Sequence, residues 1–264
     1  MYDNRPIGVL DSGVGGLTVA KELRKELPNE NIIYFGDNAN VPYGNKSEKE
    51  IYNLTKKMID FLASKNVKMI AIACNTISSI LDKYFIDYKI PIISIIKPAV
   101  DYAVDNDLNK VGVLATNFTI ESGAYEKLLK KKNKSIEVVP ESCPTLATLV
   151  DSGDYTKEEM EKTIDIHMSN ILENNNLKDI ILGCTHYPIV LDKFKKRGPE
   201  INFINPAYEQ TIYIKNLLDR KDLTGDSWES RLEIYTTGDA GTYINMIELL
   251  DVATPYNINA MDVL

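Results

Sequence analysis

Metal ligands and disulfide partners are scarce in this sequence. It holds only three cysteines and two histidines in 264 residues. Disulfide-dependent domains carry more cysteines in shorter chains, so we expect reduced thiols rather than a disulfide framework. No combination of these residues has the spacing of a zinc site, such as two cysteines two residues apart. The sequence therefore predicts no metal ion.

Long apolar runs are absent as well. A membrane-spanning helix needs roughly 18 apolar residues without charge, and the best candidate, residues 69–81, is interrupted by polar residues that include Asn75 and Thr76. The opening segment MYDNRPIGVL carries an acidic residue, Asp3, and too short an apolar run for a secretory signal. We therefore expect a cytoplasmic protein with no membrane partner.

Positive charge is in deficit. The formal net charge is −8 at pH 7 and the isoelectric point is about 5.0. A surface that binds nucleic acid needs a basic patch, so this balance argues against a nucleic-acid partner. Hydrophobic residues make up 44% of the chain and charged residues 26%, which excludes a disordered protein. The length allows one large domain or two small ones.

Short apolar runs alternate with longer amphipathic segments along the chain. The runs are continuous rather than alternating, which is typical of parallel strands that are covered on both faces. Strands that alternate with helices indicate βα units, and the predicted fold class is α/β. The runs expected to be strands are Ile7–Leu10, Asn31–Phe35, Met69–Ala73, Ile90–Ile96, Val111–Ala115, Asp179–Gly183 and Ile201–Asn205.

Two helices can be predicted from their capping residues. Ser47 and Glu50 have the spacing of a capping box, and the apolar residues Ile51, Leu54, Met58 and Leu62 follow on one helical face. Thr156 and Glu159 have the same spacing, ahead of the apolar residues Met160, Ile164, Met168 and Ile171.

The two halves of the sequence resemble each other weakly. The segment PIGVLDSGVGGLTVAKEL is similar to KVGVLATNFTIESGAYEKL, and KMIAIACNT is similar to KDIILGCTH. The offset from Ile7 to Val111 is close to the offset from Cys74 to Cys184. Two parallel similarities with nearly equal offsets predict two similar α/β halves.

Cys74 and Cys184 each follow directly on a predicted strand. Ligands of parallel sheets bind beyond the carboxyl ends of the strands, so both thiols are expected where chemistry occurs. A single cysteine is often only a small buried apolar residue, but the paired occurrence favours a functional role. Polar residues follow each cysteine, and a strand-to-helix turn there would offer backbone N–H groups to a carboxylate.

Two thiols suit the inversion of a carbon stereocentre. Inversion by deprotonation needs a base on one face and an acid on the other. The ordinary pKa of cysteine, about 8.5, makes thiol and thiolate both accessible near neutral pH. If each sulfur reaches the same carbon, the two should lie roughly 6–7 Å apart, too far for a disulfide. We therefore expect a proton to pass between Cys74 and Cys184 through the substrate.

Further candidates lie in two turns and beside Cys184. Asp11 and Ser12 belong to a glycine-rich turn whose spacing matches neither a dinucleotide loop nor a P-loop; they could contact a substrate ammonium group or a thiol, or simply cap a helix. Tyr43 and Gly44 could offer a ligand a hydroxyl group and a closely approaching backbone.

His186, next to Cys184 and Thr185, could help to orient or protonate a ligand. His167 is expected in a core or interface, and Cys143 is expected to be structural.

Four motifs, LDSGVGGLTV, VPYG, ACNT and GCTHYP, occur in this order along the chain, with weaker ones at NPAYEQT and TTGDAG. In these residues the chain resembles glutamate racemase, a bacterial cell-wall enzyme of the aspartate/glutamate racemase superfamily, over nearly its whole length. The resemblance implies two similar α/β domains, residues 1–97 with 207–264 and residues 98–206, with the active site in the cleft between them. It also implies interconversion of L- and D-glutamate for peptidoglycan, no cofactor, and a homodimer.

The resemblance assigns roles residue by residue. Cys74 and Cys184 match the proton-transferring cysteines, with Asp11 and His186 assisting them. Asp151 is the remaining catalytic candidate: it lies eight residues after Cys143, where the family usually has glutamate, and is one methylene shorter. Thr148 likewise stands where a proline is common in the family. The substrate-contacting positions are Asp11, Ser12, Tyr43, Gly44, Asn75, Thr76, Thr185 and His186.

Three alternatives stay open at this point. The same site could racemise aspartate or another small acidic amino acid. A non-catalytic binding protein with a hinged pair of α/β domains would also fit. A thiol redox enzyme fits poorly, because the paired cysteines lie far apart in the sequence and form no CxxC motif.

Overall fold

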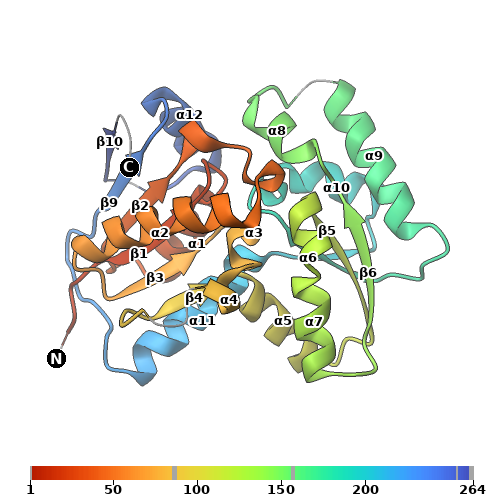
Figure 1. Cartoon of the computed structure of the whole chain (residues 1–264), viewed down its shortest axis with the longest axis horizontal. Coiled ribbons are helices and arrows are strands. Elements are labelled where there is room, and N and C mark those ends of the chain that lie inside the picture. The colour runs from red at the N-terminus through yellow and green to blue at the C-terminus, as the bar shows by residue number, and fades with distance from the viewer. Residues whose placement is uncertain (1, 85–87, 156–157, 254, 262–264) are drawn as a thin grey trace.

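Two parallel β-sheets, joined by helices, make up the computed structural model, which describes residues 2–84, 88–155, 158–253 and 255–261 (Figure 1). The first sheet has the strand order β10-β9-β2-β1-β3-β4 and the second the order β6-β5-β7-β8. The strands are β1 (Ile7–Asp11), β2 (Ile32–Gly36), β3 (Met69–Ile72), β4 (Ile92–Ser94), β5 (Lys110–Ala115), β6 (Glu137–Ser142), β7 (Asp179–Gly183), β8 (Asn202–Ile204), β9 (Leu232–Thr236) and β10 (Tyr256–Ala260).

Helices connect successive strands and cover both sheets, as the predicted α/β class requires. They are α1 (Leu17–Glu26), α2 (Glu48–Ser64), α3 (Asn75–Ser78), α4 (Leu81–Tyr84), α5 (Ile96–Asp105), α6 (Asn117–Ser122), α7 (Ala124–Lys132), α8 (Leu146–Asp151), α9 (Glu158–Leu172), α10 (Leu191–Arg197), α11 (Pro206–Arg220) and α12 (Ala240–Leu250), with short 3₁₀ turns η1 (Asn38–Asn40), η2 (Tyr43–Asn45) and η3 (Tyr187–Val190). In the described parts of the chain, none of these helices has the length and apolarity that crossing a membrane requires.

Each of the seven predicted strands is present. The strand predicted over Ile90–Ile96 is longer than the observed β4, because only residues 92–94 pair with β3 and Ile96 already begins α5. The strands β6, β9 and β10 escaped prediction because none is a continuous buried apolar run. In β9 only alternate residues are fully buried, and the edge strands β6 and β10 are half-exposed and partly polar.

The predicted capping box at the start of α2 is confirmed. The Ser47 hydroxyl accepts the backbone N–H of Glu50, and the Glu50 carboxylate accepts the backbone N–H of Ser47. On the predicted face Ile51, Met58 and Leu62 are fully buried, whereas Leu54 is half-buried. Thr156, in the second predicted box, lies outside the described residues. The predicted apolar face of α9 is buried: Met160, Ile164, Met168 and Ile171.

The two halves share one topology. Strands β2-β1-β3-β4 of the first sheet and β6-β5-β7-β8 of the second follow the same order, and the described pairs are parallel. The predicted similarity of the halves is therefore confirmed. Cys74 follows β3 and Cys184 follows β7, so the two cysteines come after equivalent strands.

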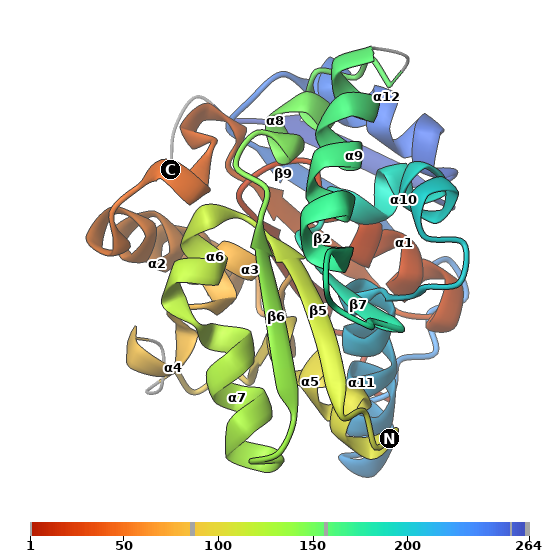
Figure 2. The same cartoon turned by 90° about the vertical axis from the view of Figure 1, so that its right-hand side faces the viewer.

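A shared apolar layer joins the two sheets. In Figure 1, α5 and α11 lie between the sheets, and their residues belong to one buried cluster with side chains from both, including Val9, Ala99, Val113 and Ile214. Each fully buried aliphatic side chain contributes about 1.5–3 kcal/mol. Helix α2 covers the other face of the first sheet, and α8, α9 and α10 cover that of the second (Figure 2).

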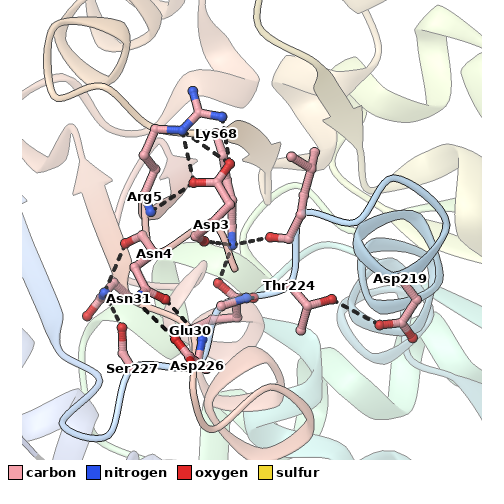
Figure 3. A network of polar contacts seen from close by, with 12 residues as sticks. Asp3, Asn4, Arg5, Glu30, Asn31, Lys68, Asp219, Thr224, Asp226 and Ser227 are labelled. Carbon is pink, nitrogen blue, oxygen red and sulfur yellow. Dashed lines mark hydrogen bonds and ion pairs between the residues drawn. The ribbon is translucent and has the colours of Figure 1, made fainter. Parts of the chain in front are cut away.

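A buried ion pair lies at the other end of β3 from Cys74. Lys68 Nζ is 2.5 Å from Glu30 Oε2, and both side chains are fully buried. The ammonium group also donates to the carbonyl oxygens of Asp3 (2.8 Å) and Leu223 (2.7 Å), and Glu30 Oε1 accepts the N–H of Gly225 (Figure 3). The loop that follows α11 is thereby attached to the start of β3.

Candidate active site

One cavity contains most of the predicted site residues. It lies beyond the carboxyl ends of β3 and β7, where the parallel-sheet rule places ligands. Among its lining residues are ten of the eleven predicted site residues: Ser12, Tyr43, Gly44, Cys74, Asn75, Thr76, Asp151, Cys184, Thr185 and His186. The eleventh, Asp11, is fully buried behind this surface. The structure therefore brings both thiols to a single cavity.

Cys74 is the N-cap residue of α3. Its sulfur lies 3.5 Å from the Ser12 hydroxyl. Burial raises the pKa of Cys74 to about 12, and the Asp11 carboxylate adds to this, while the hydrogen bonds from Ser12 and from the Ile77 backbone act in the opposite direction. The charge of Cys184 contributes in the same direction as Asp11. Near neutral pH Cys74 is therefore a neutral thiol that can donate a proton.

Cys184 lies at the end of a short polar chain. Its sulfur is 3.5 Å from His186 Nδ1, and His186 Nε2 is 2.7 Å from Asp151 Oδ1. Burial lowers the pKa of His186, but the Asp151 carboxylate and Cys184 outweigh it and raise the pKa well above its ordinary value. Asp151, although one methylene shorter than glutamate, does reach the imidazole of His186. The resulting contact keeps a positively charged imidazole beside the Cys184 sulfur.

Asp11, the last residue of β1, connects the turn after β1 with the turn that follows Cys184. Its Oδ1 accepts the backbone N–H of Gly13 (2.9 Å), and its Oδ2 accepts the hydroxyl of Thr185 (3.2 Å). Burial raises the pKa of Asp11 from its ordinary value of 3.8 to about 6, although His186 and these hydrogen bonds oppose the shift. Asp11 thus holds the turn after Cys184 against the turn after β1.

The shift in Asp11 predicts a pH dependence of stability. A carboxyl group whose pKa is raised by folding stabilises the protein below about pH 4, and this contribution is lost as pH rises through about 6. Relative to Asp11→Asn, the wild-type free energy of unfolding should fall by up to about 3 kcal/mol between pH 4 and pH 7. Urea unfolding of both proteins at several pH values measures the difference. Parallel pH profiles would contradict the assignment.

The remaining predicted residues differ in what they can offer a ligand. The Tyr43 hydroxyl donates to Asp37 Oδ2 at 2.6 Å, so Tyr43 and the adjacent Gly44 can offer their backbone but not that hydroxyl. Asn75 Oδ1 accepts the Tyr125 hydroxyl (2.7 Å), which leaves the Asn75 amide nitrogen, buried and without a partner among the described residues, to donate. The Thr76 hydroxyl lies 3.1 Å from that of Thr116.

Several lining residues were not among the predicted site residues: Val41, Pro42, Asn45, Thr116, Asn117, Pro144, Ala147 and Thr148. A signal for Thr116 was present. In the internal similarity, IGVLDSG aligns with VGVLATN, so Thr116 follows β5 as Ser12 follows β1. Ala147 of α8 carried no such signal, because that helix has no counterpart in the repeated segments.

Cys143 and His167 lie outside the cavity. Cys143 is fully buried in the core beside α8, as predicted for a structural residue. His167 is only half-buried, and its Nδ1 lies 2.7 Å from Glu141 Oε1. It is therefore not a core residue, and its placement in an interface stays a prediction. Within the described ranges, no three His, Cys, Asp or Glu side chains are grouped so that they could hold a metal ion.

The fold and the cavity together define a class of enzyme. Two equivalent strand ends present a thiol each to one cavity, and a carboxylate and a charged imidazole support the thiols. Such a pair can deprotonate and reprotonate one carbon, which is what an amino-acid racemase, an isomerase, requires.

Comparison with known proteins gives the family. The model of the Asp/Glu/Hydantoin racemase family matches residues 7–207. The chain is 36% identical to glutamate racemase 3 of Caldanaerobacter subterraneus over 98% of this chain and 96% of that protein. It therefore belongs to the Asp/Glu/Hydantoin racemase family and is an amino-acid racemase.

Two solved structures support this assignment. Glutamate racemase isoform RacE1 from Bacillus anthracis is 32% identical, with a TM-score of 0.93 over 98% of each chain. The glutamate racemase from Francisella tularensis, solved in complex with D-glutamate, is 35% identical, with a TM-score of 0.88 over 98% of each chain. Both similarities extend over nearly the whole chain.

Proposed function

We propose that this protein interconverts L- and D-glutamate by proton transfer between Cys74 and Cys184. The observation that carries the proposal is the presence of both thiols, each after an equivalent strand, in the lining of one cavity. The relatives named above are glutamate racemases, and one was solved with D-glutamate. The product D-glutamate would serve peptidoglycan synthesis.

In one direction, the Cys184 thiolate takes the α-proton of glutamate and becomes a thiol. The Cys74 thiol then gives its proton to the opposite face of the same carbon and becomes a thiolate. The reverse reaction exchanges the two roles. His186, kept positively charged by Asp151 at 2.7 Å, stabilises negative charge at the Cys184 sulfur. Ser12, at 3.5 Å, does the same at Cys74 through its hydroxyl.

Neutral donors would hold the substrate carboxylates. Asn75 lines the cavity, and its buried amide nitrogen has no partner among the described residues. The hydroxyls of Thr76 and Thr116 and the backbone of Tyr43 and Gly44 add further polar groups. These groups would also stabilise the negative charge that develops on the α-carboxylate as the α-proton leaves.

Racemisation of aspartate or another small acidic amino acid remains the alternative reaction. The same donors could hold a shorter side chain, but the relatives at 36% identity over nearly the whole chain are glutamate racemases, and the alternative has no such support. Assays with glutamate and aspartate under the same conditions distinguish the two.

The decisive test is incubation of the purified protein with L-glutamate in deuterated water, without any added cofactor. We expect loss of optical activity, and the D-glutamate that forms should carry deuterium at the α-carbon. Circular dichroism follows the first and mass spectrometry the second. Inversion without deuterium would contradict thiol-mediated proton transfer, and binding without inversion would indicate a binding protein.

The proposal includes the wider organisation that the resemblance implied. Residues 1–97 with 207–264 would form one domain and residues 98–206 the other, with the cavity between them. We also propose a cytoplasmic homodimer that works without a cofactor. Sedimentation of the purified protein tests the dimer.

A further inference from the structure

Gln210 is a fully buried polar residue that the mechanism above does not use. It lies on α11, in the weakly matching segment NPAYEQT. Its amide nitrogen donates to two backbone carbonyl oxygens, those of Ile72 (3.0 Å) and Ile93 (2.9 Å). Its amide oxygen has no partner among the described residues. A buried amide that serves two strands at once fixes their relative position.

The two carbonyls lie where β3 and β4 separate. Ile72 is the last residue of β3 and Ile93 the middle residue of β4, and their chains then turn into α3 and α5. On the side of β1 the sheet continues, because the N–H of Ala73 donates to the carbonyl oxygen of Leu10. On the side of β4 the Ile72 carbonyl oxygen needs a donor from elsewhere, and Gln210 supplies it. Besides Gln210, the Ser78 hydroxyl donates to Ile72, at 3.5 Å. Cys74 follows two residues later.

Helix α11 connects this point to the second cysteine. It follows directly on β8, which pairs with β7, and Cys184 comes after β7. The loop after α11 is attached through the Leu223 carbonyl to Lys68, the residue before β3 (Figure 3). The helix is therefore fastened to both ends of β3: through Gln210 at the carboxyl end, and through Lys68 at the amino end.

We propose that Gln210 is a positioning residue, which holds the turn bearing Cys74 at its working distance from Cys184. The inference rests on the proposed function, and it adds a residue that acts on Cys74 only through the Ile72 carbonyl. Gln210 is absent from the cavity lining, so it has no part in binding the substrate.

Gln210→Met tests the proposal, because methionine has a similar length but cannot donate a hydrogen bond. We expect kcat/KM for glutamate to fall about 30-fold, since small misplacements of reacting groups cost up to about 100-fold. Iodoacetamide labelling of each cysteine, read by peptide mass spectrometry, should rise about tenfold at Cys74 and stay unchanged at Cys184, because only the Cys74 turn opens more readily. This second readout does not depend on racemase activity.

Thr211→Val is the matched control. Thr211 is the next residue on α11, equally buried, and its hydroxyl has no partner among the described residues. Its kcat/KM and both labelling rates should match the wild type. Equal changes in the two variants, or equal labelling changes at both cysteines, would overturn the proposal. They would mean that Gln210 contributes only to the general stability of the fold. If Gln210→Met does not fold, Gln210→Asn, which is too short to reach both carbonyls, takes its place. If Gln210→Met shows the expected rise in labelling at Cys74 over the wild type, but the wild type does not racemise glutamate, only the proposed function is refuted.

Discussion

Cys74→Ser and Cys184→Ser should each lower the rate of glutamate racemisation by about a thousandfold or more. A serine hydroxyl has nearly the size of the thiol but is a far weaker acid, so it can neither hold the thiolate charge nor donate its proton at neutral pH. The loss should appear in kcat in both directions, because every turnover needs one base and one acid. Circular dichroism of L- and D-glutamate solutions measures it.

The single-thiol variants also carry a stereochemical test. In deuterated water, any exchange of the α-proton that survives should be confined to one enantiomer in each variant, because the remaining thiol reaches only one face of the carbon. The matched control is Cys143→Ala, which removes a buried thiol outside the cavity. It should lower stability by about 1 kcal/mol or more and leave the turnover of the folded protein unchanged. Undiminished racemisation in Cys74→Ser or Cys184→Ser would defeat the two-thiol mechanism.

The fold could be predicted from the sequence where burial leaves a pattern in one dimension. Strands such as β1, β3 and β7 are covered on both faces, and their continuous apolar runs are visible without a structure. The positions of Cys74 and Cys184 followed from the same pattern, because a cysteine that ends such a run must lie at the carboxyl edge of the sheet. The edge strands β6 and β10 gave no such pattern, since solvent allows polar residues there.

The contacts within the site could not be predicted, because they join residues that are distant in the sequence. Nothing near Tyr43 indicates that its hydroxyl bonds to Asp37 rather than facing a ligand. Nothing in NPAYEQT indicates that Gln210 donates to carbonyls of β3 and β4. Whether Asp151 reaches His186 depends on the placement of α8 against η3, which the spacing to Cys143 does not determine.

Gly15→Ala should strongly impair catalysis although Gly15 is not one of the predicted site residues. Gly15 lies in the turn between β1 and α1, and a methyl group there would come within 2.6 Å of both His186 Cε1 and Thr185 Oγ1. These atoms cannot withdraw easily. The imidazole is held between Cys184 and Asp151, and the Thr185 hydroxyl donates to Asp11. The need for glycine comes from this close approach, since the backbone of Gly15 is not in the left-handed region.

The added methyl group must therefore either turn the His186 ring away from Cys184 or separate the turn after β7 from the turn after β1. Either movement misplaces a reacting group by about 1 Å, and we expect kcat to fall about 100-fold while the melting temperature changes little. Gly8→Ala is the matched control in the core of the same sheet. Its methyl group would meet the side chains of Leu62 and Val67 at 3.3 Å and the Met69 carbonyl oxygen at 3.4 Å, all remote from the cavity, so it should lower the melting temperature and leave kcat intact. Wild-type kcat in Gly15→Ala would mean that the His186 turn can shift without consequence, and that the chain from Asp151 to Cys184 does not set the rate.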